Sequence, residues 1–428
     1  MKKVRLGLAG PLLAALVALI AAVAATTAAN AARSDTVTLT MMYPNTVQNA
    51  WTRTIADFEH KYPNIVIKPQ FVDGITGNTL LATQLQAGNA PDIFSVGAGT
   101  GSTTAVWNAG PAGKLFDFSD SKWVKRIPPN GLKYFTSNNK VYGWPMAVST
   151  NGVLYNTTLF NQLKLHVPVN IKDALAQCKT IKADGKIPYA LGFAGSSVGV
   201  SVMVLQLTNQ FVYGQDKSWV AKRIANKVTF ASSPLWRNLF TAVSNLSKNG
   251  CFNSNPAGTS YPTGAGNLVA SGQAVMEFLS GGTINSVTSI NPDLKYAMFQ
   301  FPPDNSGGKH TVASIGFALN IGANAATKHP AEVKKFFDFI ADPDVDVAWA
   351  TAAGSIAPLN AIKGLFPSYL AASDAPLAKA GRLVVNQSSE IPNPGFNTAL
   401  INEVIGVIDG QETVASALSA LDKSWATP

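Results

Sequence analysis

Apolar residues recur at strand and helix spacings along this sequence. An apolar run at 37–42 predicts a strand, and the next apolar side chains fall at the three- and four-residue steps of a helix face: Val47, Trp51, Ile55, Phe58 and Tyr62. A strand at 64–72, a helix at 76–87 and a short buried strand at 92–96 follow. This alternation predicts a parallel sheet flanked by helices, with ligand-binding loops beyond the carboxyl ends of its strands.

A second strand and helix pattern begins at 152–155, which predicts a second α/β unit packed against the first. Asn170 is a suitable N-cap for a helix over 171–183, and Gly185 is a suitable end for it. A strand at 187–193 and a loop at 194–199 come next. Further helices are predicted to about residue 211, from 234 until Gly250, over 331–340 and 343–352, and through most of 398–425.

The segment before this pattern is typical of an export signal. Three basic residues within the first five precede an uncharged apolar run over 6–25, and Ala29-Asn30-Ala31 offers an A-x-A cleavage site. We therefore expect a signal peptide at 1–31, cleaved after Ala31, and a protein secreted to the periplasm or the extracellular space. The apolar run is also long enough to span a bilayer, so an uncleaved membrane anchor is the alternative.

Charged residues are sparse and scattered, at 13% of the 428 residues. Lys2, Lys3 and Arg5 account for three of the 33 basic residues, so the remainder carries 30 basic and 24 acidic residues, a net charge of +6. No cluster of basic residues of the kind that follows a phosphate backbone is present, and we expect no nucleic-acid partner. The low charge content suggests that the protein works in acidic surroundings outside the cell. Carboxylates would be protonated there, so buried ion pairs would add little stability.

Two cysteines, Cys178 and Cys251, are present with four scattered histidines, which cannot complete a zinc site. We expect neither a metal nor a cofactor. In an exported protein a pair of cysteines favours one disulfide. The alternative for Cys178 is a buried thiol, because it shares a predicted helix face with Leu175 and Ile181.

One motif points to an enzyme. Residues 195–199 read G-x-S-x-G between a predicted strand and a predicted helix, where the nucleophile elbow of a hydrolase would place Ser197. His310 or His329 would have to complete a triad, but one lies in a polar turn, the other starts a surface helix, and no His-Gly-Gly-Gly segment is present. Other catalytic and phosphate-binding signatures are absent. The sequence favours a binding protein, with a serine hydrolase as the minor alternative.

Five blocks of sequence identify a family by their order and spacing. They are Leu85 to Phe94 (LQAGNAPDIF), Tyr142 to Pro145 (YGWP) with Leu154 to Phe160 (LYNTTLF), Ile181 to Pro188 (IKADGKIP), the helix over 331–340, and Gly354 with Pro358. In these blocks the chain resembles the extracellular solute-binding proteins of family 1, the sugar-capturing subunits of ABC importers. The resemblance covers essentially all of the chain after the export signal.

This resemblance implies a two-lobed α/β fold, in which each lobe is a mainly parallel sheet flanked by helices and the ligand cleft lies between the lobes. Lobe one would comprise residues 32–149 and 313–357, and lobe two residues 150–312 and 358–428. It further implies a non-catalytic monomer that captures a sugar or oligosaccharide by hinge closure and delivers it to an ABC permease.

A sugar cleft needs aromatic faces together with amide and hydroxyl groups, because each buried hydroxyl left unpaired costs about 1–3 kcal/mol. We expect the segments 280–283 and 314–317 to face the cleft. The ligand-binding residues predicted from the loops and from the resemblance are Tyr43, Asn45, Gly99, Ser102, Trp107, Ser149, Asn151, Ser196, Ser197, Gly282, Thr283, Gly316 and Phe396. For each aromatic residue an ordinary place in the core is the alternative.

The chain departs from the family pattern at one place. Relatives often carry a sugar-stacking tryptophan soon after the segment that here reads Ala274-Val275-Met276, but residues 277–285 contain none. Either another aromatic side chain stacks on the sugar, or the ligand is smaller or less sugar-like. A polyol or a phosphodiester is therefore the nearest alternative ligand, whereas a polyamine would need carboxylates that the expected cleft loops lack.

Overall fold

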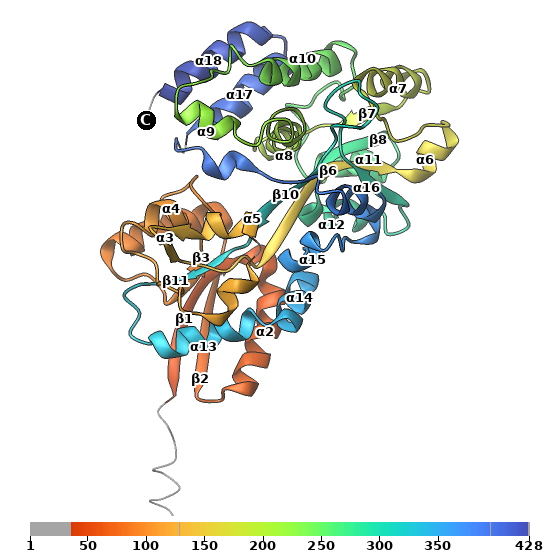
Figure 1. Cartoon of the computed structure of the whole chain (residues 1–428). Helices are drawn as coiled ribbons and strands as arrows, with labels where there is room; N and C mark the ends of the chain where they lie inside the picture. The colour runs from red at the N-terminus through yellow and green to blue at the C-terminus, as the bar shows by residue number, and fades with distance from the viewer. Residues whose placement is uncertain (1–35, 128, 394, 427–428) are drawn as a thin grey trace, which may run out of the picture.

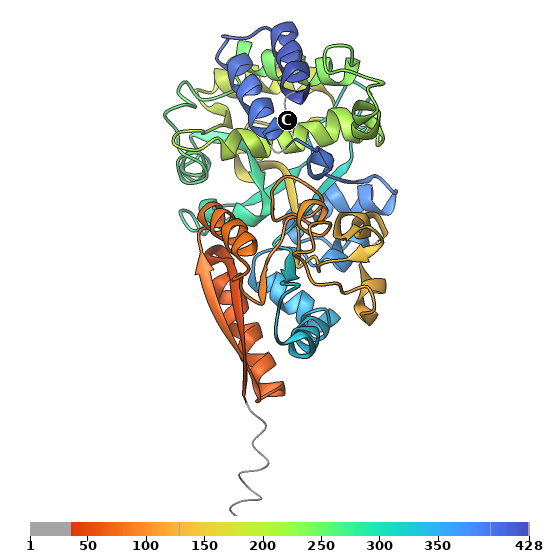
Figure 2. The same ribbon diagram turned by 90° about the vertical axis from the view of Figure 1, so that its left-hand side faces the viewer.

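The computed structural model of the protein describes residues 36–426, apart from residues 128 and 394. The export signal expected at 1–31 lies outside the described residues. Within those residues, no helix combines the length and the apolar character needed to cross a membrane. The described chain forms two lobes stacked end to end, each built on its own sheet (Figures 1 and 2).

Lobe one is built on a four-stranded sheet in the order β11, β3, β1, β2. Strand β1 pairs in parallel with β2 and β3, and β11 adds an antiparallel edge. The strands are β1 (Val37–Pro44), β2 (Ile65–Val72), β3 (Ile93–Ser95) and β11 (Ile321–Ala323), with a small hairpin of β4 (Thr136–Ser137) and β5 (Lys140–Val141). The helices are α2 (Gln48–Lys61), α3 (Gly74–Ala87), α4 (Val106–Ala109), α5 (Pro129–Leu132), α13 (Pro330–Ile340) and α14 (Pro343–Ala352).

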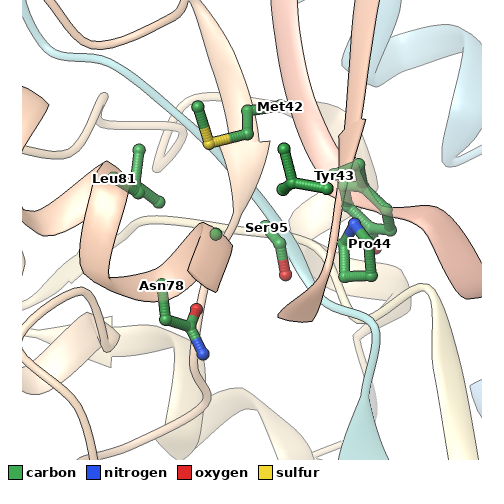
Figure 3. A pocket seen from close by; sticks show the side chains of 8 residues that line it. Met42, Tyr43, Pro44, Asn78, Leu81 and Ser95 are labelled. Carbon is green, nitrogen blue, oxygen red and sulfur yellow. The ribbon is translucent and has the colours of Figure 1, made fainter. Parts of the chain in front are cut away.

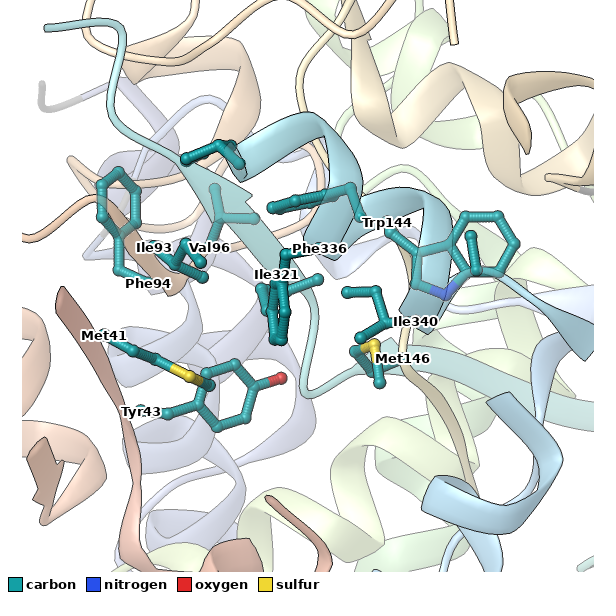
Figure 4. Close-up of a cluster of buried hydrophobic side chains, with 14 of the residues drawn as sticks. Met41, Tyr43, Ile93, Phe94, Val96, Trp144, Met146, Ile321, Phe336 and Ile340 are labelled. Carbon is teal, nitrogen blue, oxygen red and sulfur yellow. The ribbon is translucent and has the colours of Figure 1, made fainter. Parts of the chain in front are cut away.

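Aromatic side chains from β1, α2, α13 and α14 pack together in the lobe-one core. Figure 4 shows part of this core, including Tyr43 of β1 and Phe336 of α13. The Trp51 ring lies 5.0 Å from Tyr43, 5.2 Å from Trp349 and 6.0 Å from Phe336, measured between ring centroids. Such pairs contribute about 0.5–1.5 kcal/mol each beyond the area they bury. Because α13 and α14 follow β11 in the sequence, this core joins residues near 50 to residues near 340.

Lobe two is built on a sheet in the order β12, β10, β6, β8, β7, with β9 also paired to β6. Its strands are β6 (Ala147–Asn156), β7 (Ile187–Ala190), β8 (Ala274–Ser280), β9 (Tyr296–Phe299), β10 (Ala313–Ala318) and β12 (Leu383–Val385). Its helices are α6 (Thr157–Gln162), α7 (Ile171–Ala183), α8 (Val198–Thr208), α9 (Trp219–Ile224), α10 (Pro234–Lys248), α11 (Thr263–Ala270), α12 (Asn285–Thr288), α15 (Pro358–Ile362), α16 (Ser368–Lys379), α17 (Phe396–Ile408) and α18 (Val414–Ala426).

The two-lobed α/β fold is as expected, but the second sheet is mixed rather than mainly parallel. Strand β6 pairs antiparallel with β8, β9 and β10, and only β7 with β8 and β10 with β12 run in parallel. In the mainly parallel sheet that the family resemblance implied, β6 would have parallel neighbours. Three strands that come much later in the sequence take those places instead.

Most elements predicted from apolar spacing are present. The helices predicted over 171–183 and 343–352 begin and end at those residues, and the Asn170 side chain accepts a hydrogen bond from the Asp173 amide, as an N-cap should. Helix α8 continues into a π-helical turn over Asn209–Tyr213, and the helical tail divides into α17 and α18. The predicted disulfide is also present, joining Cys178 of α7 to Cys251, just beyond α10.

Three buried carboxyl groups are a notable feature of both cores. Asp346 accepts a hydrogen bond from the Trp144 indole, and Asp374 accepts hydrogen bonds from Gln300 and Ser373. Burial raises the pKa of each aspartate to about 7. Glu277 on β8 is 1% exposed, and burial raises its pKa well above the ordinary value. At acidic pH these groups are neutral, which removes the cost of burying a charge.

We expect the disulfide to stabilise lobe two substantially. It closes a loop of 73 residues that contains β7 and α8, and the chain-entropy model gives about 4 kcal/mol for such a loop. The double variant Cys178→Ala/Cys251→Ala should therefore lose about 4 kcal/mol of unfolding free energy, measured by urea denaturation. Reductant should lower the stability of the original protein and leave that of the variant unchanged. Equal stability of the two proteins under oxidising conditions would contradict this expectation.

We also expect the protein to be more stable at about pH 5 than at about pH 8. The folded-state pKa of Asp346 and of Asp374 is near 7, above the ordinary value of 3.8. Between these values the folded chain holds protons that the unfolded chain has released, so stability falls as pH rises. From about pH 5 up to the folded-state pKa near 7, the loss is at most about 3 kcal/mol per group.

Urea denaturation at both pH values tests this expectation, with the near-isosteric variants Asp346→Asn and Asp374→Asn. Each variant should show a smaller loss of stability between about pH 5 and about pH 8 than the original protein. Asp338→Asn, at an exposed position of α13, is the matched control and should leave the pH dependence unchanged. Stability that rises with pH over this interval would show that these aspartates are charged in the folded protein.

Candidate functional site

Two adjoining pockets lie between the lobes. The hinge pocket has a space of about 480 Å³ and is lined by strands β6 and β10, by Tyr134 of lobe one and by the segment 385–389 of lobe two. The loop pocket has a space of about 800 Å³ and is lined mainly by the segments 95–102 and 317–320. Because Ala98, Phe317, Ser388 and Ser389 line both pockets, the two form one cleft.

The wall of the hinge pocket is set by the pairing of β6 with β10. Ser149 and Asn151 are two residues apart on β6, so both point to the same face of the sheet. Gly316 lies directly opposite Ser149, whose hydroxyl donates a hydrogen bond to the Gly316 carbonyl at 3.4 Å. Among the described residues, the side-chain amide of Asn151 has no hydrogen-bond partner, so it is available to a ligand.

Loops of the two lobes meet at the other side of the cleft. The Thr100 amide donates to the Ser389 carbonyl at 2.7 Å, and the Gly99 amide donates to the Tyr134 carbonyl at 2.8 Å. Gly99 has a φ of +61°, and a Cβ atom there would lie 2.2 Å from the Ser389 carbonyl oxygen. This position therefore requires glycine on two grounds, backbone conformation and space.

Tyr134 joins the lobes through a charged pair at the edge of the cleft. Its hydroxyl donates to Glu390 Oε1 at 2.6 Å, and Lys133 Nζ lies 2.6 Å from the same oxygen. Burial, and after it the Glu390 carboxylate, raises the pKa of Tyr134 far above its ordinary value, so the hydroxyl stays a neutral donor. Lys133 and Glu390 neutralise each other, and the described residues that line the two pockets include no charged side chain.

Several residues predicted from the sequence lie at this cleft. Ser149, Asn151 and Gly316 line the hinge pocket, and Ser102 lines the loop pocket. Gly99 lies between the lining residues Ala98 and Thr100. Trp107 lies one layer behind: its ring stacks on Tyr134 at a centroid distance of 6.1 Å, and its indole donates to the carbonyls of Lys133 and Thr136.

Tyr43, Phe396 and Asn45 lie elsewhere. The two aromatic side chains are 0% exposed, Phe396 against Phe230 and Tyr43 against Trp51, so both take the alternative place in the core. Tyr43 also lines a small pocket of about 240 Å³ between β1 and α3 (Figure 3). Its hydroxyl donates a hydrogen bond to the Leu319 carbonyl. Asn45 is exposed in the turn after β1 and lines neither cleft pocket.

Four predicted residues lie in lobe-two loops outside the two pockets. Ser196 and Ser197 follow β7, and Gly282 and Thr283 follow β8. Because β7 and β8 run in parallel, their carboxyl ends and these loops lie at the same edge of the sheet. The Thr283 hydroxyl is 3.1 Å from that of Tyr261, and the other three residues are exposed.

The hydrolase motif gains no partner in the structure. Ser197 is exposed immediately before α8, and no hydrogen bond of the described residues, which include all four histidines, joins it to a histidine. His310 Nδ1 is bonded to Asp304, and His329 precedes α13 in lobe one. Among the described residues, no histidine is therefore hydrogen-bonded to Ser197 as its general base.

The sequence did not single out Tyr134, Leu205 or the segment 386–389 as cleft residues. Tyr134 lies in a three-residue turn with no regular apolar spacing, and Leu205 looks like any apolar residue of a buried helix. A usable signal exists for 386–389, because Asn386-Gln387-Ser388-Ser389 is a polar run directly after the short apolar strand β12. The same reasoning that selected the other loops would have selected this one.

Comparison with known proteins places the chain in a family. Residues 44–347 match the family model for the bacterial extracellular solute-binding protein. The multiple sugar-binding protein of Streptococcus mutans is 25% identical over 318 residues, which cover 72% of each chain. RafE in complex with raffinose superposes with a TM-score of 0.73 at 22% identity, over 91% of this chain and all of RafE. Apo-RafE from Streptococcus pneumoniae gives the same TM-score at 21% identity, over 92% of this chain and 99% of that one. With the family match spanning most of the chain and the two-lobed fold in common, this protein belongs to the bacterial extracellular solute-binding proteins.

Proposed function

We propose that this protein is an exported, non-catalytic receptor that captures a sugar or oligosaccharide in the interlobe cleft and delivers it to an ABC permease. Family membership supports a receptor, and the names of two similar proteins, the multiple sugar-binding protein and the raffinose complex of RafE, support a carbohydrate ligand. The same comparisons support a site of action outside the cytoplasm.

The chemistry of the cleft carries this proposal. Hydroxyl and amide groups of Ser149, Asn151, Ser388 and Asn386 line the hinge pocket, and a sugar presents the same kinds of donor and acceptor. A phosphodiester would call for a cation, and a polyamine for several carboxylates. Neither kind of group lines the cleft among the described residues, so the phosphodiester alternative is disfavoured and a polyol remains the nearest rival.

Ligand capture by hinge closure would use the three crossings between the lobes. We assign residues 32–149 and 313–357 to lobe one and residues 150–312 and 358–428 to lobe two. In support, core membership changes from lobe one at Ala147 to lobe two at Val148. At the last crossing Ile356 packs in a lobe-two cluster, Ala357 in the lobe-one core and Ala361 again in the lobe-two cluster, so this crossing extends over about residues 356–361. At the remaining crossing, β10 pairs within the second sheet and β11 within the first, so by strand pairing the chain passes between the lobes after Ala318 and before Ile321, later than the boundary at 313.

A thermal-shift screen against neutral sugars and polyols tests the ligand class, and Asn151→Ala then tests the site. A ligand that binds only the folded protein raises its melting temperature. On the sugar that the screen selects, loss of the Asn151 amide should weaken binding about 10- to 100-fold by calorimetry, because a sugar hydroxyl is left unpaired.

Asn161→Ala, at an exposed position of α6, is the matched control and should leave the affinity unchanged. If a polyol and no sugar stabilises the protein, the carbohydrate assignment is wrong. If Asn151→Ala binds the selected sugar as tightly as the original protein does, the sugar lies outside the hinge pocket.

The hydrolase alternative has a separate test at Ser197. We expect the purified protein to hydrolyse short-chain nitrophenyl esters no faster than the buffer does, and Ser197→Ala to leave that rate unchanged. The physical reason is that no histidine, all four of which the structure describes, is hydrogen-bonded to Ser197, and a serine hydroxyl without such a base is a weak nucleophile. Turnover that the substitution abolishes would overturn the receptor assignment.

A further inference from the structure

Helix α3 of lobe one presents an uncharged polar face beside the cleft. None of its 14 residues carries a charge, and Asn78, Thr79, Thr83 and Gln86 are exposed along it. Surface helices ordinarily carry charged side chains on their solvent face. This face is therefore unusual even in a chain with few charges, and α3 lies at the end of lobe one that faces lobe two (Figure 1).

A groove of about 790 Å³ runs along this face. It is lined by Asn78, Thr79, Ala82, Thr83, Gln86 and the loop residues Ser102 and Thr103. Asn78 and Ser102 also line the loop pocket, so the groove continues from the cleft. In Figure 3 the Asn78 amide points away from Met42 and Leu81, out of the small apolar pocket.

We propose that the binding cleft extends along α3 as a track for the outer units of an uncharged oligosaccharide. The proposal rests on the function proposed above and specifies its ligand as a glycan of several neutral sugar units. The inner units would occupy the hinge and loop pockets, and the outer units would lie against Asn78, Thr83 and Gln86. We call these outer positions the α3 track.

The groups on the α3 track match a neutral glycan. The Thr83 hydroxyl donates to the Thr79 carbonyl at 3.1 Å and keeps its lone pairs for a sugar hydroxyl. Among the described residues the Gln86 amide has no hydrogen-bond partner, so it offers both a donor and an acceptor. From Asn78 to Gln86 the helix rises about 12 Å, which exceeds the length of one sugar ring.

The absence of charge is what points to a neutral ligand. Charged sugars would gain from a paired cation or carboxylate, and none lines the hinge pocket, the loop pocket or the groove among the described residues. Lys133 and Glu390 beside the cleft neutralise each other. Hydroxyl and amide groups alone discriminate sugars by geometry, and they add affinity with each unit that they contact.

Oligosaccharides of increasing length, from one to six units, test the track. Neutral xylo-, chito-, malto- and raffinose-type series would be titrated calorimetrically against the original protein and against Thr83→Ala/Gln86→Ala. We expect affinity to rise with length in one series. The double variant should lose about tenfold in affinity for the long members and nothing for the shortest binder, because two hydrogen bonds are removed only from the outer units.

A matched control exists on α2, where Gln48 and Thr52 are exposed. The Thr52 hydroxyl donates to the Gln48 carbonyl at 3.0 Å, which is the same kind of bond that Thr83 makes on α3. The variant Gln48→Ala/Thr52→Ala should bind every member as the original protein does. If short sugars bind but longer ones bind no better, or if the Thr83 and Gln86 substitutions leave the gain intact, the track is wrong and the receptor function stands. If no sugar of any length binds, the proposed function itself fails.

Discussion

The antiparallel pairing of β6 with β10 is the interaction on which the rest of the structure depends. Ser149 lies opposite Gly316 and Val148 opposite Phe317, and both strands continue into lobe one, where the Trp144 amide donates to the Ile321 carbonyl. The third crossing is bonded to the same ribbon, because the Val148 amide donates to the Ile356 carbonyl. One hydrogen-bonded ribbon therefore joins the lobes and also forms the wall of the hinge pocket.

A second connection closes the opposite side of the cleft. The segment 386–391 is held in lobe two by the pairing of β12 and by burial of Ile391, and it contacts lobe one through Ser389 and Glu390. Glu390 accepts hydrogen bonds from both Lys133 and Tyr134, which leaves the cleft next to a neutralised pair rather than a free charge. The position of the lobes and the electrostatics of the site thus depend on the same few contacts.

Few charged groups are present in this protein, and the buried carboxyl groups are favoured in their neutral form. Charged residues are 13% of the chain, none lines the cleft among the described residues, and burial favours the neutral form of the carboxyl groups of Glu277, Asp346 and Asp374. Protonation of these three buried groups costs the folded protein little. Composition suggested that the protein works in acidic surroundings. The raised pKa values of the buried aspartates favour stability in the same pH range.

The sequence by itself determined the local elements and the family. Helix α7 begins after Asn170 and α14 begins at Pro343 because caps and first-turn prolines act within a few residues of the chain. Sequence blocks shared with the family extended this to the two-lobed fold and to Ser149, Asn151 and Gly316. The resemblance placed these residues at the crossings between the lobes, and the pairing of β6 with β10 was then seen only in the structure.

Only the tertiary structure decided which residues meet. Tyr134 lies 256 residues before Glu390, which Ser389 directly precedes in the sequence, and no local spacing brings them together. Tyr43 and Phe396 have the side chains that stack on sugars, yet Tyr43 is covered by Trp349 of the distant helix α14, and Phe396 by the distant Phe230 and by Trp425 of the following helix. The sequence around an aromatic residue does not show whether its ring faces a cleft or a core. Burial of the ring depends on which elements pack over it, and long-range contacts decide that.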